Sequence, residues 1–385
     1  MEEVNLSGGN KESKTESKTE STIESKIKSN RIIQFLKEYK YEILLSLISI
    51  AVVLYKLWTM YPSLPSLSSL SSNLLNDHGS EYSGNIDLVY TWVDGSDKNW
   101  LQKKNKYSKN QNQKEDNIRF TTIDELKYSL RSAYEHASWI NNIYIVADDV
   151  QKPTWLNIDH PKIHLIKHSQ IFKNTSDLPS FNSFSIESNL HNIPGLSENF
   201  LYLNDDMFFG NHTQRNEFIT PSGKLLYYPY PTNCVFDTEK IPDEEAWWYS
   251  WTKTQSLLKN KLNIEPSCQW HFGIMLKKSH FTEVKKIFPE EFQNVSASKF
   301  RHKTNIVPYG IAYQYGLNKN DYEIKPPLTS ALVDARFDLK YINNGLRNIQ
   351  QMKPKMFCIN NVSNYDKNIV SFLEYYFPDK SPYEI

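Results

Sequence analysis

Apolar runs and amphipathic stretches alternate along the chain from about residue 85. Four short, nearly continuous apolar runs are typical of strands buried on both faces. A helical pattern follows Thr122, which stands three residues before Glu125 as in a capping box. Strands that alternate with helices in this way predict an α/β fold, Rossmann-like, with a mainly parallel sheet and helices on both faces. The predicted strands are Ile86–Val93, Asn142–Ala147, Ile163–Ile166 and Asn199–Leu203.

After Gly210 the pattern is weaker but still alternates. Lys224–Tyr228 is expected to form a strand, and Pro and Gly residues limit several of the predicted helices. We find no internal repeat and no gap long enough to separate a further domain, so residues 85–385 are treated as one domain. The predicted helices are Phe184–His191 before Gly210, and Trp247–Leu262, Ser279–Phe288 and Val370–Phe377 after it.

The N-terminal 84 residues predict a membrane anchor. Residues 1–40 are rich in Glu, Ser, Lys and Thr and predict a disordered cytosolic tail. Residues 41–61 are apolar with Tyr and Trp at the flanks, and predict a single transmembrane helix that precedes the domain. The excess of Lys and Arg before this helix places the rest of the chain in the lumen, as in a single-pass type II membrane protein. We expect the membrane to be that of the Golgi. Residues 62–84 would be a stem. A buried helix and a cleaved signal peptide are the alternatives.

Carboxylates follow two of the predicted strands. Asp94 and Asp97 follow the first strand, and Asp205 and Asp206 follow the fourth. Ligands bind at the carboxyl ends of strands in open α/β sheets, and paired carboxylates there commonly hold Mg²⁺ or Mn²⁺ against a diphosphate. We expect Asp205 and Asp206 to hold the metal, and Asp94 and Asp97 to complete its site or to bind the nucleotide. Gly95 would let the backbone approach the ligand. Helix capping and solvated turns are the structural alternatives.

The composition limits the possible partners and cross-links of the chain but does not identify a function. The 385 residues include 44 basic and 44 acidic side chains, so the formal net charge is zero and no nucleic-acid partner is expected. The aromatic content of 14% suits a carbohydrate-facing surface, although Tyr and Trp also pack in ordinary cores. The three cysteines allow at most one internal disulfide and have no metal-binding spacing. Four glycosylation sequons begin at Asn174, Asn211, Asn294 and Asn361, and we expect the last to be unmodified.

The strand and acid elements together resemble the Stealth family of hexose-1-phosphate transferases. That family includes bacterial capsule polymerases and the α/β subunit of the lysosomal-enzyme N-acetylglucosamine-1-phosphotransferase. The resemblance is most specific in IDLVYTWVDGSD and LYLNDDMFFG, and it covers nearly all of the predicted lumenal domain. The similar regions are Ile86–Asp97, Ile118–Gly210, Gln269–Tyr315 and Phe357–Glu384.

The resemblance implies a reaction and further site residues. An acceptor hydroxyl would attack the sugar-bearing phosphate of a UDP-sugar, such as UDP-N-acetylglucosamine, and release UMP with the help of Mg²⁺ or Mn²⁺. His271 would be the general base and Arg301 would bind phosphate oxygens. Asn361 occupies a position where the family carries an acid. Arg119 would face phosphate or be an ordinary surface charge, and the same two interpretations apply to Arg131.

Two departures from the family pattern leave other functions open. The family usually has His-x-Pro where this chain has His271-Phe272-Gly273, and Asn-Asp where it has Asn360-Asn361. Loss of an acid could reduce metal affinity or activity, which would suit a catalytically weak binding protein or partner subunit. A metal-dependent glycosyltransferase that releases UDP is the other alternative. The expected acceptor is a hydroxyl of a glycan or glycoprotein, and the oligomeric state is left open, with a homodimer among the options.

Overall fold

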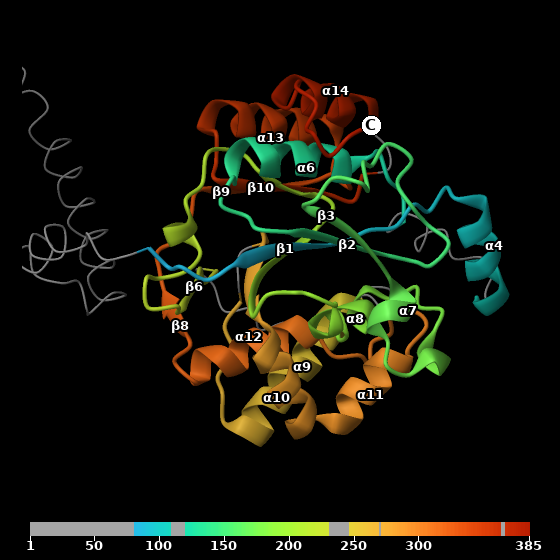
Figure 1. The fold of residues 1–385 in the computed structure, drawn as a ribbon, viewed down its shortest axis with the longest axis vertical. Helices are drawn as coiled ribbons and strands as arrows, with labels where there is room; N and C mark the ends of the chain where they lie inside the picture. The colour runs from blue at the N-terminus through green and yellow to red at the C-terminus, as the bar shows by residue number, and fades with distance from the viewer. Residues whose placement is uncertain (1–80, 109–119, 231–245, 269–270, 363–365) are drawn as a thin grey trace, which may run out of the picture. The chain divides into compact units, whose positions relative to one another are not determined.

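The computed structural model describes residues 81–108, 120–230, 246–268, 271–362 and 366–385. The description that follows concerns the unit Ser80–Ile385. Its strands and helices form layers, with sheets in the middle and helices on either side (Figure 1).

The central sheet has five strands in the order β3-β2-β1-β4-β7. Its first four strands are parallel, and β7 pairs antiparallel with β4. These strands are the apolar runs of the sequence, and almost every residue of β1, β2 and β4 is buried. Their bounds are β1 Ile86–Thr91, β2 Ile143–Ala147, β3 Ile163–Lys167, β4 Asn199–Asn204 and β7 Ile274–Lys277.

A second sheet of three strands adjoins the first through a tight connection. β4 of the central sheet is followed after two residues by β5, which belongs to the second sheet. The order there is β5-β10-β9, with β10 antiparallel to β5 and parallel to β9. A third sheet consists of β6 and β8, which are parallel. The bounds are β5 Met207–Phe209, β6 Leu225–Tyr227, β8 Tyr322–Ile324, β9 Ser330–Asp334 and β10 Met356–Asn360.

Helices cover the sheets from two sides. Figure 1 shows α6, α13 and α14 beyond β9 and β10, and α9 to α12 on the opposite side of the central strands. The helices are α4 Lys98–Tyr107, α6 Glu125–His136, α7 His168–Ile171, α8 Ser183–Glu187, α9 Ala246–Leu262, α10 Lys278–Ile287, α11 Pro289–Ala297, α12 Pro308–Asn318, α13 Leu339–Met352 and α14 Asp366–Tyr376. Short 3₁₀ turns span Thr175–Asp177, Leu190–Asn192 and Arg215–Glu217.

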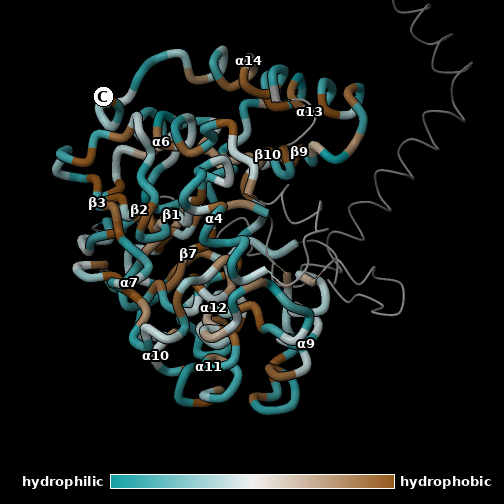
Figure 2. Tube along the Cα trace, turned by 90° about the vertical axis from the view of Figure 1, so that its right-hand side faces the viewer, coloured by the Kyte–Doolittle hydropathy of each residue, from teal (hydrophilic) through white to brown (hydrophobic). Residues whose placement is uncertain are grey.

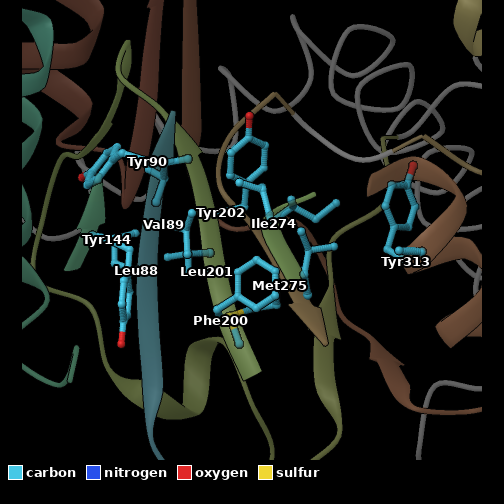
Figure 3. Close-up of a cluster of buried hydrophobic side chains, with 14 of the residues drawn as sticks. Leu88, Val89, Tyr90, Tyr144, Phe200, Leu201, Tyr202, Ile274, Met275 and Tyr313 are labelled. Atoms are coloured by element: carbon cyan, nitrogen blue, oxygen red, sulfur yellow. The ribbon is translucent and has the colours of Figure 1, made fainter. Parts of the chain in front are cut away.

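Two apolar clusters hold the layers together. The larger surrounds the central sheet and includes Leu88, Leu201 and Met275, which Figure 3 shows side by side on β1, β4 and β7. The smaller lies between the second sheet and the helices α13 and α14, where the rings of Phe208 and Phe357 stack with centroids 4.9 Å apart. In the hydropathy colouring of Figure 2, β7 is apolar, whereas α13 mixes apolar and polar positions, as expected of a helix with one buried face. Each buried side chain of this size contributes about 1.5–3 kcal/mol.

The fold class predicted from the sequence needs correction. The α/β alternation is present, but the sheets are mixed and only partly parallel, because β7 and β5 return in the antiparallel sense. The predicted single transmembrane helix is not supported: in the part of the chain that the structure describes, no helix is long and apolar enough to cross a membrane. Residues 41–61 lie outside the described residues. The expected Golgi location stays a prediction.

Several helix boundaries also differ from expectation. The helix expected over Phe184–His191 ends at Glu187, and a 3₁₀ turn follows it. Thr122 is not an N-cap: α6 begins at Glu125, and Asp124 precedes it with a φ of 64°. The Glu125 carboxylate accepts hydrogen bonds from the Thr122 hydroxyl at 2.8 Å and the Ile123 amide at 2.9 Å. The two residues therefore do interact, but they lie two positions before those that a capping box requires.

The C-terminal residues are tied to α6 by a buried ion pair. The Arg131 guanidinium donates to both carboxylate oxygens of Glu384, at 2.9 and 2.7 Å, and to the Phe377 carbonyl at 2.9 Å. Both side chains are largely buried. Arg131 is thus bound by the C-terminal residues of the chain. This ion pair accounts for Arg131 in place of both the surface-charge and the phosphate interpretations.

We expect Arg131→Leu to destabilise the domain by about 3 kcal/mol, because Glu384 would stay buried without its counter-ion. Arg131 lowers the pKa of Glu384, so the contribution of the pair is present above the ordinary carboxyl pKa and is lost as pH falls through the lowered value. Urea unfolding at pH 7 and pH 3 measures both effects. Lys259→Leu, which removes an exposed partner of Glu265, is the control and should change stability by less than about 0.5 kcal/mol. Equal losses in the two variants would contradict the expectation.

Candidate functional site

The carboxyl ends of three parallel strands meet at one edge of the central sheet. Thr91 at the end of β1 pairs in register with Val146 of β2 and with Asn204 of β4. The loops after β1, β2 and β4 therefore leave the sheet at the same edge, where open α/β sheets bind ligands.

The loop after β1 is held by its own polar groups. One oxygen of the Asp94 carboxylate accepts from the Ser96 amide at 2.8 Å and from its hydroxyl at 2.6 Å. Asp97 caps α4 by accepting from the Trp100 amide at 2.8 Å. The Gln151 side chain donates to the Asp94 carbonyl at 2.5 Å and accepts from its amide at 3.3 Å. Asp94 and Asp97 therefore both stabilise the conformation of this loop. The other carboxylate oxygen of Asp94 takes no part in these hydrogen bonds.

Gly95 has a structural reason to lack a side chain. Its amide donates to the Phe120 carbonyl at 2.8 Å. A Cβ at this position would lie 2.1 Å from the same carbonyl oxygen, which is shorter than any tolerated contact. The close backbone approach at Gly95 is thus made with residue 120 of the same chain. Arg119, the neighbour of Phe120 in sequence, lies outside the described residues.

Asp205 and Asp206 occupy the turn that joins the two larger sheets. Both follow β4 and precede β5, and both are half-buried. The Asp206 carbonyl accepts from the Ile359 amide of β10 at 3.1 Å, which fixes the turn to the second sheet. The Asp206 Oδ1 atom is buried and has no hydrogen-bond partner. A buried carboxylate oxygen without a partner calls for an explanation, and a bound ion or water is a common one.

Three carboxylates share this corner of the molecule. Burial, Glu125 and Asp206 together raise the pKa of Asp205 well above its ordinary range. Burial and Glu125 raise the pKa of Asp206 to about 7, against a hydrogen bond from the Cys358 thiol. Burial also raises the pKa of Glu125. Negative charges that are desolvated and mutually repulsive favour either a proton or a cation.

The donor set fits a divalent cation shared with a substrate. Mg²⁺ commonly takes one or two carboxylates and completes its shell with phosphate oxygens and water. Asp205 and Asp206 supply the two carboxylates, and the unpartnered oxygen of Asp206 is a ready ligand atom. Among the described residues there is no group of three or more His, Cys, Asp or Glu side chains placed to hold a metal by themselves. A cation here would therefore need ligands from the substrate.

A second polar group lies at the same edge, around a buried glutamate. The Tyr202 hydroxyl is 3.1 Å from a Glu187 oxygen, 3.1 Å from the Thr91 hydroxyl and 2.9 Å from the Asn204 side chain. Figure 3 shows that this hydroxyl points toward the carboxyl end of β1. The other Glu187 oxygen is buried without a hydrogen-bond partner. Burial raises the pKa of Glu187 to about 7, and the charge of Arg301 opposes the shift.

Arg301 is held against α8. Its guanidinium donates to the Ser183 hydroxyl at 2.5 Å and lies 4.4 Å from the centre of the Phe184 ring. Asn182 accepts from the Phe184 amide to start this helix, and its amide group donates to the carbonyl of Phe300, next to Arg301. The arginine is thus positioned from two sides, with its charge beside Glu187.

His271 belongs to a third group, at the end of the second sheet. Its Nε2 atom lies 3.4 Å from the Asn360 amide nitrogen. The ring reaches solvent, yet the surrounding protein atoms lower the pKa of His271, and Asp334 opposes that shift. Asn361 has a φ of 61° and donates to Asp334 at 3.1 Å. The amide nitrogen of Asn361 is therefore engaged with a carboxylate.

Cys358 connects the third group to the aspartate pair. This free, buried thiol is on β10, and its pKa is raised by burial and then by Asp206, Asp205 and Asp334. The carboxylates of both groups are therefore close enough to act on one thiol. The other cysteine among the described residues, Cys268, is disulfide-bonded.

Some residues of the site were missing from the sequence prediction. Glu125, Glu187 and Asp334 were not proposed as site residues, because only the folded chain brings them to the strand ends. One sequence feature pointed to Glu187, because this residue lies in the long region of family resemblance, Ile118–Gly210. Asp148 and Asp149 follow β2 but have local roles: Asp148 pairs with Lys103 at 2.7 Å, and Asp149 bonds the Ser169 side chain.

Comparisons with known proteins identify the family of the chain. Three conserved regions of the Stealth proteins match the chain in order: region 1 at residues 84–111, region 2 at 119–226 and region 3 at 271–315. The chain belongs to the Stealth family. The fourth region of resemblance, Phe357–Glu384, stays a prediction.

Curated relatives extend the similarity over most of the chain. An exopolysaccharide phosphotransferase of Streptomyces coelicolor is 35% identical over 318 residues, which are 78% of this chain and 57% of that protein. The exopolysaccharide phosphotransferase CpsY of Mycobacterium tuberculosis is 32% identical over 327 residues, which are 80% of this chain and 59% of that protein. The chain thus spans little more than half the length of these relatives. Mouse xyloside xylosyltransferase 1 in its apo form is similar only at a TM-score of 0.34 and 9% identity, over 71% of this chain and 97% of that one, which supports no conclusion.

The raised pKa of Asp206 predicts that ionisation of this carboxyl group lowers the free energy of unfolding of the domain. A carboxyl group whose folded pKa lies above its unfolded value binds a proton more tightly in the folded state, so stability falls as pH rises from about the unfolded to the folded pKa. In EDTA at pH 8, Asp206→Asn should therefore raise the Tm by roughly 2–6 °C, and the difference should disappear near pH 4. Differential scanning calorimetry at both pH values measures this. Asp149→Asn, at the neighbouring strand end, is the control, and a lower Tm for Asp206→Asn at pH 8 would contradict the expectation.

Proposed function

We propose that this chain transfers a sugar-1-phosphate, N-acetylglucosamine-1-phosphate in the first instance, from a UDP-sugar to a hydroxyl of a glycan or glycoprotein, with release of UMP. Family membership and the names of the curated relatives support transfer of a sugar phosphate in general. The single observation that carries the proposal is the Asp205-Asp206 turn, with a buried unpartnered oxygen, at the edge where Tyr202, Glu187 and the strand ends meet.

The proposed reaction is a displacement at phosphorus. The acceptor oxygen forms a bond to the phosphorus that bears the sugar, and the bond from that phosphorus to the bridging oxygen of UMP breaks. UMP leaves with the electron pair of the broken bond, and the proton of the acceptor hydroxyl passes to a base. When bound, a divalent cation would neutralise the charge of the diphosphate. Asp205 and Asp206 would hold that cation.

His271 is the proposed base. The lowered pKa of its imidazole keeps the ring neutral at neutral pH, so it can accept a proton. Asn360 fixes the ring from one side, and the charge of Asp334 would stabilise the protonated form. Asn361 serves this group through its bond to Asp334, which gives the asparagine a role without a cation.

Arg301 is the proposed phosphate ligand. A guanidinium can donate to two phosphate oxygens at once, and its planar fork suits this geometry. Ser183 and Phe184 orient the group, which limits the freedom that would be lost on binding. Glu187 lies beside Arg301 and Tyr202, and would hold both of them relative to the strand ends.

The product nucleotide tests the proposal directly. We expect the protein to release UMP from UDP-N-acetylglucosamine in the presence of Mn²⁺ and an oligosaccharide acceptor, as measured by chromatography of the nucleotides. The Asp205→Ala, Asp206→Ala pair should lower the rate at least 100-fold, whereas Asp149→Ala should keep it within about twofold. Release of UDP would instead indicate a glycosyltransferase that breaks the sugar–oxygen bond, and no release from any UDP-sugar would favour a binding protein.

Cation binding gives a test that does not depend on turnover. Because Asp206 must lose its proton to bind a metal, and its pKa is raised to about 7, Mn²⁺ affinity should rise between pH 6 and pH 8. The rise should be several-fold in the presence of UDP, as measured by electron paramagnetic resonance of free Mn²⁺. The Asp205→Ala, Asp206→Ala pair should abolish this binding, and the same Asp149→Ala control should retain it. Affinity that is independent of pH and of both aspartates would place the cation elsewhere.

A further inference from the structure

Exposed apolar side chains are concentrated in one short stretch that leads from β9 into α13. Large apolar residues are mostly buried in the part of the chain that the structure describes. Between residues 332 and 341, however, Leu332, Phe337, Leu339 and Tyr341 are exposed by 45%, 55%, 39% and 42%. Apolar side chains that gather at the surface commonly mark a binding site, whereas single exposed ones need no explanation.

This stretch begins on the same sheet face as the candidate site. Leu332 pairs in register with Cys358, and Asp334 pairs with Asn360. Alternate residues of a strand point to one face of its sheet, and residues paired in register point to the same face. These four side chains therefore share one face of the second sheet, and the Cys358 thiol beside Asp206 lies on that face. The exposed Leu332 therefore lies on the site side of β9, next to the group that contains His271.

The aromatic members of the stretch are fixed in place. The rings of Phe337 and Tyr341 lie 4.6 Å apart at an interplanar angle of 48°. The Phe337 amide donates to the Asp334 carbonyl at 3.3 Å, and the Tyr341 amide donates to the Asp338 carboxylate at 2.8 Å, which starts α13. The pair is thus anchored at one end by a site residue and at the other by a helix cap, and it needs no ordering before a ligand binds.

We propose that Phe337, Tyr341 and Leu332 form the acceptor platform, a surface that binds a pyranose ring of the acceptor saccharide. The platform rests on the proposed function, because it supplies the second substrate of that reaction. A pyranose has an apolar face of C–H groups and a polar rim of hydroxyls. The aromatic pair can cover the apolar face, while the rim meets Asp334 and Asn360.

The chemistry of the stretch favours a sugar over an apolar partner. Asp334, Arg336, Asp338 and Lys340 alternate with the exposed apolar side chains. Asp334 and Arg336 form an ion pair at 2.7 Å within the stretch. A second protein chain would bury a larger and more continuous apolar surface. A single sugar ring needs only a small apolar area with polar groups around it, which is what residues 332–341 offer.

The test separates acceptor binding from donor chemistry. We expect Phe337→Ala with Tyr341→Ala to lower kcat/KM for an oligosaccharide acceptor roughly tenfold, while the slow release of UMP from UDP-N-acetylglucosamine in the absence of acceptor is unchanged. Phe337→Trp with Tyr341→Phe keeps both rings and should restore acceptor use. Tyr375→Ala removes an aromatic side chain of α14 that is 70% exposed, and serves as the matched control.

Binding is measured independently of turnover by saturation-transfer NMR with methyl α-glucopyranoside and methyl β-galactopyranoside. We expect the wild-type protein to transfer saturation to the ring C–H protons of at least one glycoside, and the double alanine variant to lose this signal. If the wild type binds a glycoside in this way but releases no UMP from any UDP-sugar, the proposed reaction is wrong and the platform stands.

Four results would overturn the platform. The wild type could give no signal with either glycoside, or the double alanine variant could bind as the wild type does. An equal loss of acceptor-independent UMP release would show that the pair supports the fold of the site instead. A change in oligomeric state of the double alanine variant, seen by size-exclusion chromatography with light scattering, would assign the surface to a second copy of the chain.

Discussion

The site depends on one covalent constraint: the chain passes from the central sheet to the second sheet in the two residues Asp205 and Asp206. β4 fixes the start of this turn through its pairing with β1, and β5 fixes its end through its pairing with β10. The backbone of neither residue can move without disturbing a sheet. This placement also withdraws both carboxylates partly from water and sets them beside Glu125, which explains why protons bind there more tightly than usual.

The three polar groups of the site come from different layers. The aspartate turn belongs to both sheets, Arg301 and Glu187 are attached to the α8 side, and His271 with Asn360 belongs to the end of the second sheet. Tyr202 connects the second group to the strand ends, and Cys358 connects the third group to the aspartates. Such a site requires the correct packing of several layers, so its geometry is a property of the whole domain.

The sequence predicted the strands well and the site in part. Near-continuous apolar runs identified β1 to β4, and the acids after β1 and β4 lie at one sheet edge because these strands are parallel and in register. The antiparallel strands β5 and β7 were not predicted in their roles, since pairing direction depends on contacts distant in sequence. Asp334 was beyond reach and Glu187 had only its place in a region of family resemblance to mark it, because burial and neighbours give both residues their importance. Gly95 was predicted to let the backbone approach a ligand. In the folded chain, the atom nearest to a Cβ added at Gly95 is the Phe120 carbonyl oxygen.

The packing of α13 and α14 against the second sheet has a consequence for how this enzyme family can diversify. Phe208 on β5 and Phe357 on β10 stack in that layer, and each is adjacent in sequence to a residue that flanks the aspartate turn or to the thiol beside it. Changes in the volume of these distant helices would therefore shift the spacing between His271 and the two aspartates by fractions of an ångström. The turnover rate could thus change during evolution while every polar side chain of the site stayed the same.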